Sequence, residues 1–155
     1  MKKKMLYGAL ATVMCLGVVG CGNDNVENKD LTADDREEKH ENKVVCNYLQ
    51  SDGKYVLYFD ENDVIEGFDA YSSIDISETS STEEDVKEMK KIVCNGEGEF
   101  KKEWIKECDM EQDGTKYTLH VYIDNGEWFG DMQNKDEILE YVNEYGIDGG
   151  DVTCK

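Results

Sequence analysis

Cysteine and histidine are the side chains of this chain with the most specific chemistry. After residue 21 there are six of them, namely His40, Cys46, Cys94, Cys108, His120 and Cys154. No two cysteines have the short spacing of a tetrahedral zinc site, so structural zinc is not expected. Two uses remain open: the cysteines form disulfides, or one of them is a nucleophile with His120 as its base. The even number of cysteines favours disulfides in an oxidising compartment.

The acidic residues do not define a catalytic site. With 36 of them in 155 residues, close carboxylate pairs are expected by chance. The serine-hydrolase, P-loop, dinucleotide and metalloprotease motifs are all missing. Asp60-Glu61-Asn62-Asp63 and Asp148-Gly149-Gly150-Asp151 could offer oxygens to calcium, but neither follows the EF-hand register, and we interpret both as turns. We therefore assign no catalytic residue, metal or cofactor.

A group of aromatic side chains is the best candidate for a ligand-binding surface. Strand periodicity places Tyr58, His120 and Tyr122 on the face opposite the apolar residues of their strands, and Trp128 follows closely. Two interpretations are open. The group forms an exposed platform for a partner, or it packs under another element, as cross-strand aromatic pairs often do.

The elements that position these residues form a weak internal repeat. Each copy has a cysteine, a polar strand, an Asp-Gly turn, Lys-Tyr and an alternating strand, and the turns are Asp52-Gly53 and Asp113-Gly114. Such turns predict tight hairpins with a positive φ at glycine. A further strand is predicted from Val64 to Ile76. The expected buried strand residues are Tyr55, Leu57, Phe59, Phe68, Ala70, Ile74, Tyr117, Leu119, Val121 and Ile123.

Each copy continues into a predicted helix. Ser81-x-x-Glu84 and Asn134-x-x-Glu137 resemble capping boxes, and Gly96 and Gly146 are expected to end the helices. The apolar stripes are Val86, Met89 and Val93, then Ile138, Leu139, Val142 and Tyr145. A last strand is expected from Asp151 to Cys154. The order predicts an α+β fold: an antiparallel sheet from two hairpin-helix pseudo-repeats, with helices on one face and disulfide bracing.

The N-terminal pattern predicts where the chain resides. Three lysines, at positions 2–4, precede an apolar run from Met5 to Val19 that is too short to span a bilayer, and Val-Val-Gly-Cys ends at Cys21. This arrangement is similar to a bacterial lipoprotein signal peptide, and no Ala-x-Ala-like cleavage site is present. The resemblance implies removal of residues 1–20 and lipidation of Cys21. Two or more acyl chains would anchor the mature protein stably.

Three segments follow from this interpretation: a signal peptide over residues 1–20, an acidic disordered tether over residues 21–42, and one α+β domain over residues 43–155. The tether has no aromatic residue and few apolar ones, so it cannot offset the entropy cost of ordering. Loss of three lysines with the signal peptide would change the formal charge from -19 to about -22. Nucleic acid is therefore an unfavourable partner, and cationic proteins or peptides are favourable ones.

We predict the pairings Cys94–Cys108 and Cys46–Cys154 among the three that four cysteines allow. Cys94 ends the first helix and Cys108 lies on the next strand, whereas Cys46 and Cys154 lie on the first and last strands. Terminal strands of an antiparallel sheet are often neighbours.

Taken whole, the chain resembles small uncharacterised surface lipoproteins of Gram-positive bacteria, on the lipobox, the acidic tether and the cysteine-bearing strands. Lysine outnumbers arginine 16 to one, which fits an AT-rich genome of that kind. The expected function is a non-catalytic binding or interaction module on the outer face of the cell membrane, with an extracellular protein or peptide as partner. An alternative is a surface inhibitor or scavenger of cationic proteins or peptides, and a third is an enzyme with His120 as base.

Overall fold

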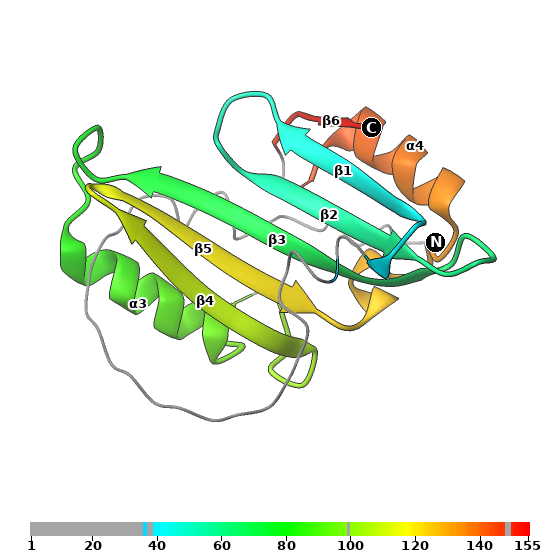
Figure 1. Ribbon diagram of the computed structural model, residues 1–155, viewed down its shortest axis with the longest axis horizontal. Helices are drawn as coiled ribbons and strands as arrows, with labels where there is room; N and C mark the ends of the chain where they lie inside the picture. Colours follow the sequence, from blue (N-terminus) through cyan, green and yellow to red (C-terminus); the bar gives the residue numbers. More distant parts are fainter. Residues whose placement is uncertain (1–35, 37–38, 99, 148–149) are drawn as a thin grey trace, which may run out of the picture.

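A computed structural model describes Arg36 and residues 39–98, 100–147 and 150–155 of the chain (Figure 1). Within this part the backbone forms one sheet of six strands in the order β4-β5-β3-β2-β1-β6, with every neighbouring pair antiparallel. The strands are β1 (Lys43–Tyr48), β2 (Lys54–Phe59), β3 (Ile65–Asp75), β4 (Ile105–Asp113), β5 (Lys116–Ile123) and β6 (Val152–Cys154). The predicted antiparallel α+β class is confirmed.

Two helices and a short 3-10 turn complete the described fold. Helix α3 (Glu83–Cys94) connects β3 to β4, the turn η1 (Gly126–Phe129) follows β5, and α4 (Lys135–Tyr145) precedes β6. Figure 1 shows α3 running beside β4 and α4 lying near β1 and β6 at the opposite end of the sheet. No described helix has the length and apolar character needed to cross a membrane.

One face of the sheet forms the core together with both helices. Alternate residues of β2, β3 and β5 are buried on this face, as their period-two pattern predicts. Val86, Met89 and Val93 of α3 and Ile138 and Val142 of α4 join the same cluster. The predicted apolar stripe of α4 was wrong at Tyr145, which is 54% exposed at the end of the helix.

The two predicted hairpin turns differ. Gly114 has φ 61° in the tight turn between β4 and β5, where glycine avoids the steric cost that other residues meet. Gly53 lies in a longer connection and is not among the residues with positive φ, so that expectation was wrong. A glycine fits here because the Tyr48 ring packs closely against the backbone: a Cβ at Gly53 would lie 2.7 Å from that ring.

The helix ends follow local chemistry. Helix α3 begins one residue later than predicted, because Thr82 is the N-cap and its backbone N–H donates to the Asp85 carboxylate at 3.0 Å. Asn134 caps α4 as expected, accepting a hydrogen bond from the Asp136 backbone N–H. Helix α4 ends at the predicted Gly146, which has φ 73°, whereas α3 has Asn95 as its C-cap and the predicted Gly96, with φ 70°, follows directly.

Both predicted disulfides are present. Cys46 and Cys154 are direct cross-strand partners and join β1 to β6, the last strand at that edge. Cys94 joins the end of α3 to Cys108 on β4, at the other edge. Each disulfide therefore fixes a terminal or edge element to the sheet. The Cys46–Cys154 disulfide closes the longer loop, with a sequence separation of 108, and so removes more entropy from the unfolded chain.

Candidate functional site

The candidate site lies on the sheet face opposite the helices and is built from one cross-strand row. Asp69 of β3 pairs in register with Tyr122 of β5, and Tyr122 pairs with Glu107 of β4. Neighbouring strands lie about 4.8 Å apart, so the backbones of Asp69 and Glu107 stand roughly 10 Å apart with Tyr122 between them. The sheet thus presents an aromatic floor with a carboxylate on each side.

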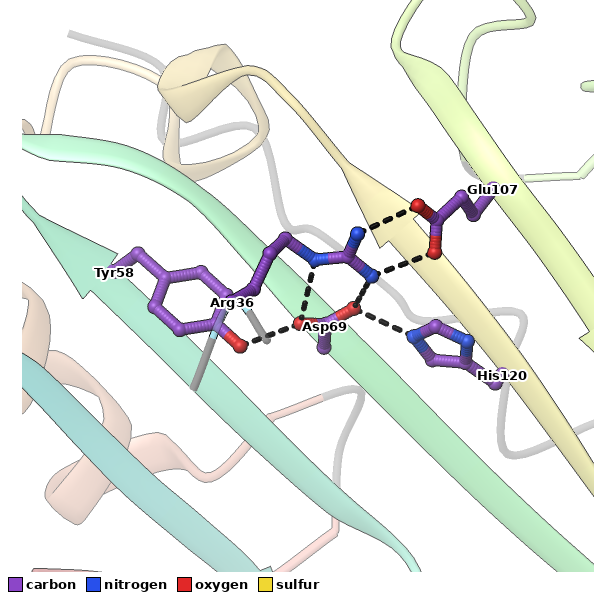
Figure 2. A network of polar contacts seen from close by, with 5 residues as sticks. All are labelled: Arg36, Tyr58, Asp69, Glu107 and His120. Atoms are coloured by element: carbon purple, nitrogen blue, oxygen red, sulfur yellow. Dashed lines mark hydrogen bonds and ion pairs between the residues drawn. The ribbon is translucent and has the colours of Figure 1, made fainter. Parts of the chain in front are cut away.

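Arg36 occupies the space between these carboxylates (Figure 2). Its Nη1 and Nη2 donate to the two oxygens of Glu107 at 2.6 and 2.7 Å, and Nη2 and Nε reach Asp69 at 3.0 and 3.3 Å. The guanidinium carbon lies 3.9 Å from the centre of the Tyr122 ring. Paired N–H donors on carboxylates combined with an aromatic face are the preferred environment of an arginine side chain. Arg36 is consequently only 4% exposed.

Asp69 is the central acceptor of the site. Besides Arg36, its carboxylate accepts the Tyr58 hydroxyl at 2.5 Å and contacts Nε2 of His120 at 2.5 Å (Figure 2). Burial alone would raise the pKa of Asp69, but the hydrogen bonds from His120, Arg36 and Tyr58 outweigh it and lower that pKa. The carboxylate therefore stays ionised, and its acceptor positions are used.

Burial also affects the pKa values of two other side chains of the site, Arg36 and Tyr122. Burial would lower the pKa of Arg36, but its hydrogen bonds to Glu107 and Asp69 raise that pKa, so the guanidinium stays charged. Burial, together with Asp124, raises the pKa of Tyr122 to about 12, so its ring remains a neutral floor. The arrangement is consequently suited to binding a permanent planar cation, and its carboxylates are occupied acceptors rather than free bases.

The residues that follow Arg36 are also fixed to the sheet. We call Arg36 and residues 39–42 the strap. The His40 ring lies 4.7 Å from the Tyr58 ring, and its Nδ1 is 3.6 Å from the Glu66 carboxylate. The Asn42 amide donates to the Asp60 carbonyl at 2.8 Å, and Asn42 accepts from Lys135.

The strap changes the predicted domain boundary. The expected disordered tether of residues 21–42 must be corrected at the strap, because hydrogen bonds and an ion pair hold these residues on the sheet. The low apolar content of this stretch was a poor guide, since its contacts are polar. The predicted signal peptide, the anchor residue Cys21 and the rest of the tether lie outside the described residues.

Three of the four predicted ligand-face residues come together here. Tyr58, His120 and Tyr122 surround Asp69, but Tyr58 is 1% exposed and the strap lies over it. The face is therefore covered by another element, as one of the two interpretations held, and is not an open platform. That element is the strap, and not the strand from Val64 to Ile76, which is part of the sheet.

Trp128 does not belong to this face. It lies in η1 on the core side of the sheet, where its ring stacks on Tyr55 at 6.1 Å and contacts Phe68 at 5.1 Å. The prediction for Trp128 was wrong because a residue that follows a strand need not keep the strand's alternation. The 3-10 turn carries the side chain back over the core.

Sequence reasoning missed Arg36, Asp69 and Glu107, the charged residues of the site. One signal was available: Arg36 is the single arginine beside 16 lysines. A lone arginine among lysines suggests a position where a guanidinium is required and an ammonium is not sufficient.

A second arrangement of ligand atoms overlaps the site. Glu107, Asp109 and His120 each offer an atom within 4.8 Å of the others, which is close enough for a shared cation. Both Glu107 oxygens, however, accept hydrogen bonds from Arg36, and His120 is bonded to Asp69. The guanidinium supplies the positive charge at this position, so a metal ion would have to displace it.

No protein-family model, no curated protein and no solved structure matches this chain.

Proposed function

We propose that this chain is a lipid-anchored extracellular binding module, non-catalytic, that recognises cationic groups of a protein or peptide partner on the sheet face opposite its helices. The lipobox at Cys21 and the preceding lysines and apolar run support the anchor. The two disulfides suit an oxidising compartment outside the cell. In that setting the chain would reside on the outer face of the cell membrane.

The observation that carries the binding proposal is the environment of Arg36. Two carboxylates and an aromatic ring hold a guanidinium with four N–H···O contacts of 2.6 to 3.3 Å. The described groups that make these contacts, Asp69, Glu107 and Tyr122, belong to the sheet. A surface that binds one basic side chain in this way has the chemistry to bind another.

Charge around the site favours the same class of partner. On β4 the residues in register with the outer face of β5 are all acidic, namely Glu107, Asp109, Glu111 and Asp113. With a formal charge of -19 for the whole chain, long-range attraction would speed the approach of a cationic partner, and added salt would weaken it. This pattern also supports the narrower role of a surface scavenger or inhibitor of cationic proteins or peptides.

The binding proposal is tested with a variant that frees the site. In Arg36→Ala, an acetylated Gly-Arg-Gly amide should bind, as measured by calorimetry at low salt. Adding Glu107→Gln should abolish this binding. The matched control adds Glu137→Gln, which removes one exposed carboxylate on α4, far from the site, and should leave binding unchanged. Absence of binding to Arg36→Ala, or an equal loss in both double variants, would contradict a specific site.

The anchor is tested separately. Intact mass of the membrane-derived protein should show a lipid adduct at Cys21, and Cys21→Ala should be released from the membrane. A Cys21→Ala variant that still carries lipid would rule the site out.

We also infer that the two cysteine-hairpin-helix units arose by duplication. The support is that β1–β2 and β4–β5 are both hairpins and that a helix follows each unit. In that case the strands and helix of one unit should superpose on those of the other in the same chain order. Superposition that requires a different order would contradict duplication.

A further inference from the structure

We propose that Arg36 is the internal occupant of an arginine-binding site, which an arginine side chain of a partner fills by replacing it. This inference rests on the proposed function and adds two points to it. The ligand is a guanidinium and not any cation, and the protein competes with its own partner for the site.

The geometry selects a guanidinium over an ammonium. Arg36 contacts the two carboxylates with three nitrogens at once, and its Nη2 lies against both of them. Both Glu107 oxygens are matched by separate N–H donors, the fork arrangement that only arginine offers. A lysine ammonium placed where Nη2 lies would contact both carboxylates, but it has neither the paired donors for the two Glu107 oxygens nor a planar face to stack on the Tyr122 ring.

The site can outlast the departure of Arg36. Its remaining members lie on β2, β3, β4 and β5, whose positions are fixed by the sheet ladder and by the core on the other face. When Arg36 leaves, Asp69 retains the Tyr58 hydroxyl and His120 as partners. Glu107 is 18% exposed even with Arg36 in place, so water can solvate it.

Arg36 differs from these residues in how it is held. It comes from the segment before β1 and contributes no strand to the sheet, so its release breaks no ladder hydrogen bonds. An incoming arginine side chain can form the same four hydrogen bonds to Asp69 and Glu107 that Arg36 forms. The cost to the incoming ligand is only the fraction of time that the site is free, since apparent affinity falls by that fraction.

The experiment compares the mature wild-type chain with Arg36→Ala, using N-acetyl-arginine amide as probe and N-acetyl-lysine amide as control. We expect the arginine probe to bind Arg36→Ala at least about tenfold more tightly than wild type, because a site that is free one-tenth of the time loses tenfold in affinity. We expect the lysine probe to bind Arg36→Ala more weakly than the arginine probe.

The outcomes separate the two proposals. Failure of both probes to bind Arg36→Ala would overturn the proposed function itself. Equal binding of arginine to wild type and to Arg36→Ala would overturn the internal competition and leave the function standing. Equal binding of the two probes would overturn the selectivity for a guanidinium.

A second measurement covers the case in which Arg36→Ala is poorly folded. Ethylguanidinium in millimolar amounts should raise the melting temperature of this variant, because a ligand that binds only the folded state stabilises it. Ethylammonium should raise it less, and neither should alter wild type. Equal effects of both compounds on the variant would contradict the inference.

Discussion

The two faces of the sheet are stabilised by different physics. On the core face, apolar side chains of four strands and two helices form one cluster, and Phe68 contacts the rings of Tyr55, Phe100, Trp128 and Phe129. On the strap face, one guanidinium, two carboxylates and two further polar groups share charge-assisted hydrogen bonds. The core face depends on buried area, whereas the strap face depends on a complete set of polar partners.

This difference determines how each face responds to damage. Apolar contacts are numerous and individually small, so one truncation leaves a cavity but no unpaired charge. The strap face depends on a few strong contacts, and loss of one charge leaves its partner buried without compensation. The strap can nevertheless leave the sheet and let water reach that partner, so the damage is limited. We therefore expect the core to control global stability and the strap face to control binding.

The largest effect is expected on the core face. Phe68→Ala should lower the free energy of unfolding by about 3 to 5 kcal/mol, because it removes a fully buried ring that contacts four others. Urea denaturation followed by circular dichroism measures this. Tyr145→Ala, at a residue 54% exposed, is the control and should change stability by less than about 1 kcal/mol. Similar losses for both variants would mean that the core is not where we place it.

The two disulfides are expected to stabilise the fold by different amounts, because they close loops of different length. Replacing Cys46 and Cys154 by alanine should cost about 5 kcal/mol, and replacing Cys94 and Cys108 about 3 kcal/mol, because the sequence separations are 108 and 14. Denaturation of both double variants under identical conditions gives the comparison. A larger loss for the shorter loop would show that native contacts, and not unfolded-chain entropy, dominate.

Asp69 should make stability depend on acid pH. Its pKa is lower in the folded state than the value of about 3.9 in an unfolded chain. Its contribution is therefore complete above about pH 4 and is lost as the pH falls through the folded pKa. Asp69→Asn should cost about 2 kcal/mol at pH 7, since the strap can leave and reduce the penalty of a broken buried pair.

Thermal melts of wild type and Asp69→Asn between pH 7 and pH 2.5 test this. Arg36, Glu107, His120 and Tyr58 surround position 69 and are unchanged in sequence, so the difference between the two curves reports the Asp69 carboxylate and its coupling to these neighbours. We expect the curves to converge at low pH. If the two curves stay parallel, ionised Asp69 is not the source of the pH dependence of stability.

The smallest expected effect is that of Arg36→Lys. This variant keeps the positive charge but loses the paired donors to Glu107, and we expect a loss of about 1 kcal/mol in stability. Chemical denaturation at pH 7 measures it. A variant as stable as wild type would show that charge alone holds the strap and would remove the basis for guanidinium selectivity.

Sequence and structure agree best where periodicity carries the information. Alternation in β5 identified its buried face. The positions of the cysteines on the predicted strands and helix led to the correct disulfide pairs. The partners of Arg36 are 33 and 71 residues away along the chain, and none of them carries a local pattern. A polar site built from one or two residues each of the strap and four strands has no period, so it could not be predicted from one sequence.

The same reasoning explains the partial success at the aromatic face. Strand parity correctly grouped Tyr58, His120 and Tyr122, because parity holds along a regular strand. Parity does not show what covers a face. The strap has few apolar residues, so composition alone indicated disorder, although its arginine provides the energy of docking through charge.

The docking of Arg36 on its two carboxylates is the central claim, and cleavage by an arginine-specific protease tests it most directly. The chain has one arginine, so cleavage at the bond after Arg36 yields a single, unambiguous pair of products. With the side chain buried, wild type should be cut slowly. Asp69→Asn and Glu107→Gln should be cut at least about tenfold faster, since about 1.4 kcal/mol of lost docking changes the open population tenfold. Glu137→Gln should be cut at the wild-type rate. Rapid cleavage of wild type, at a rate unaffected by Asp69→Asn and Glu107→Gln, would contradict the account.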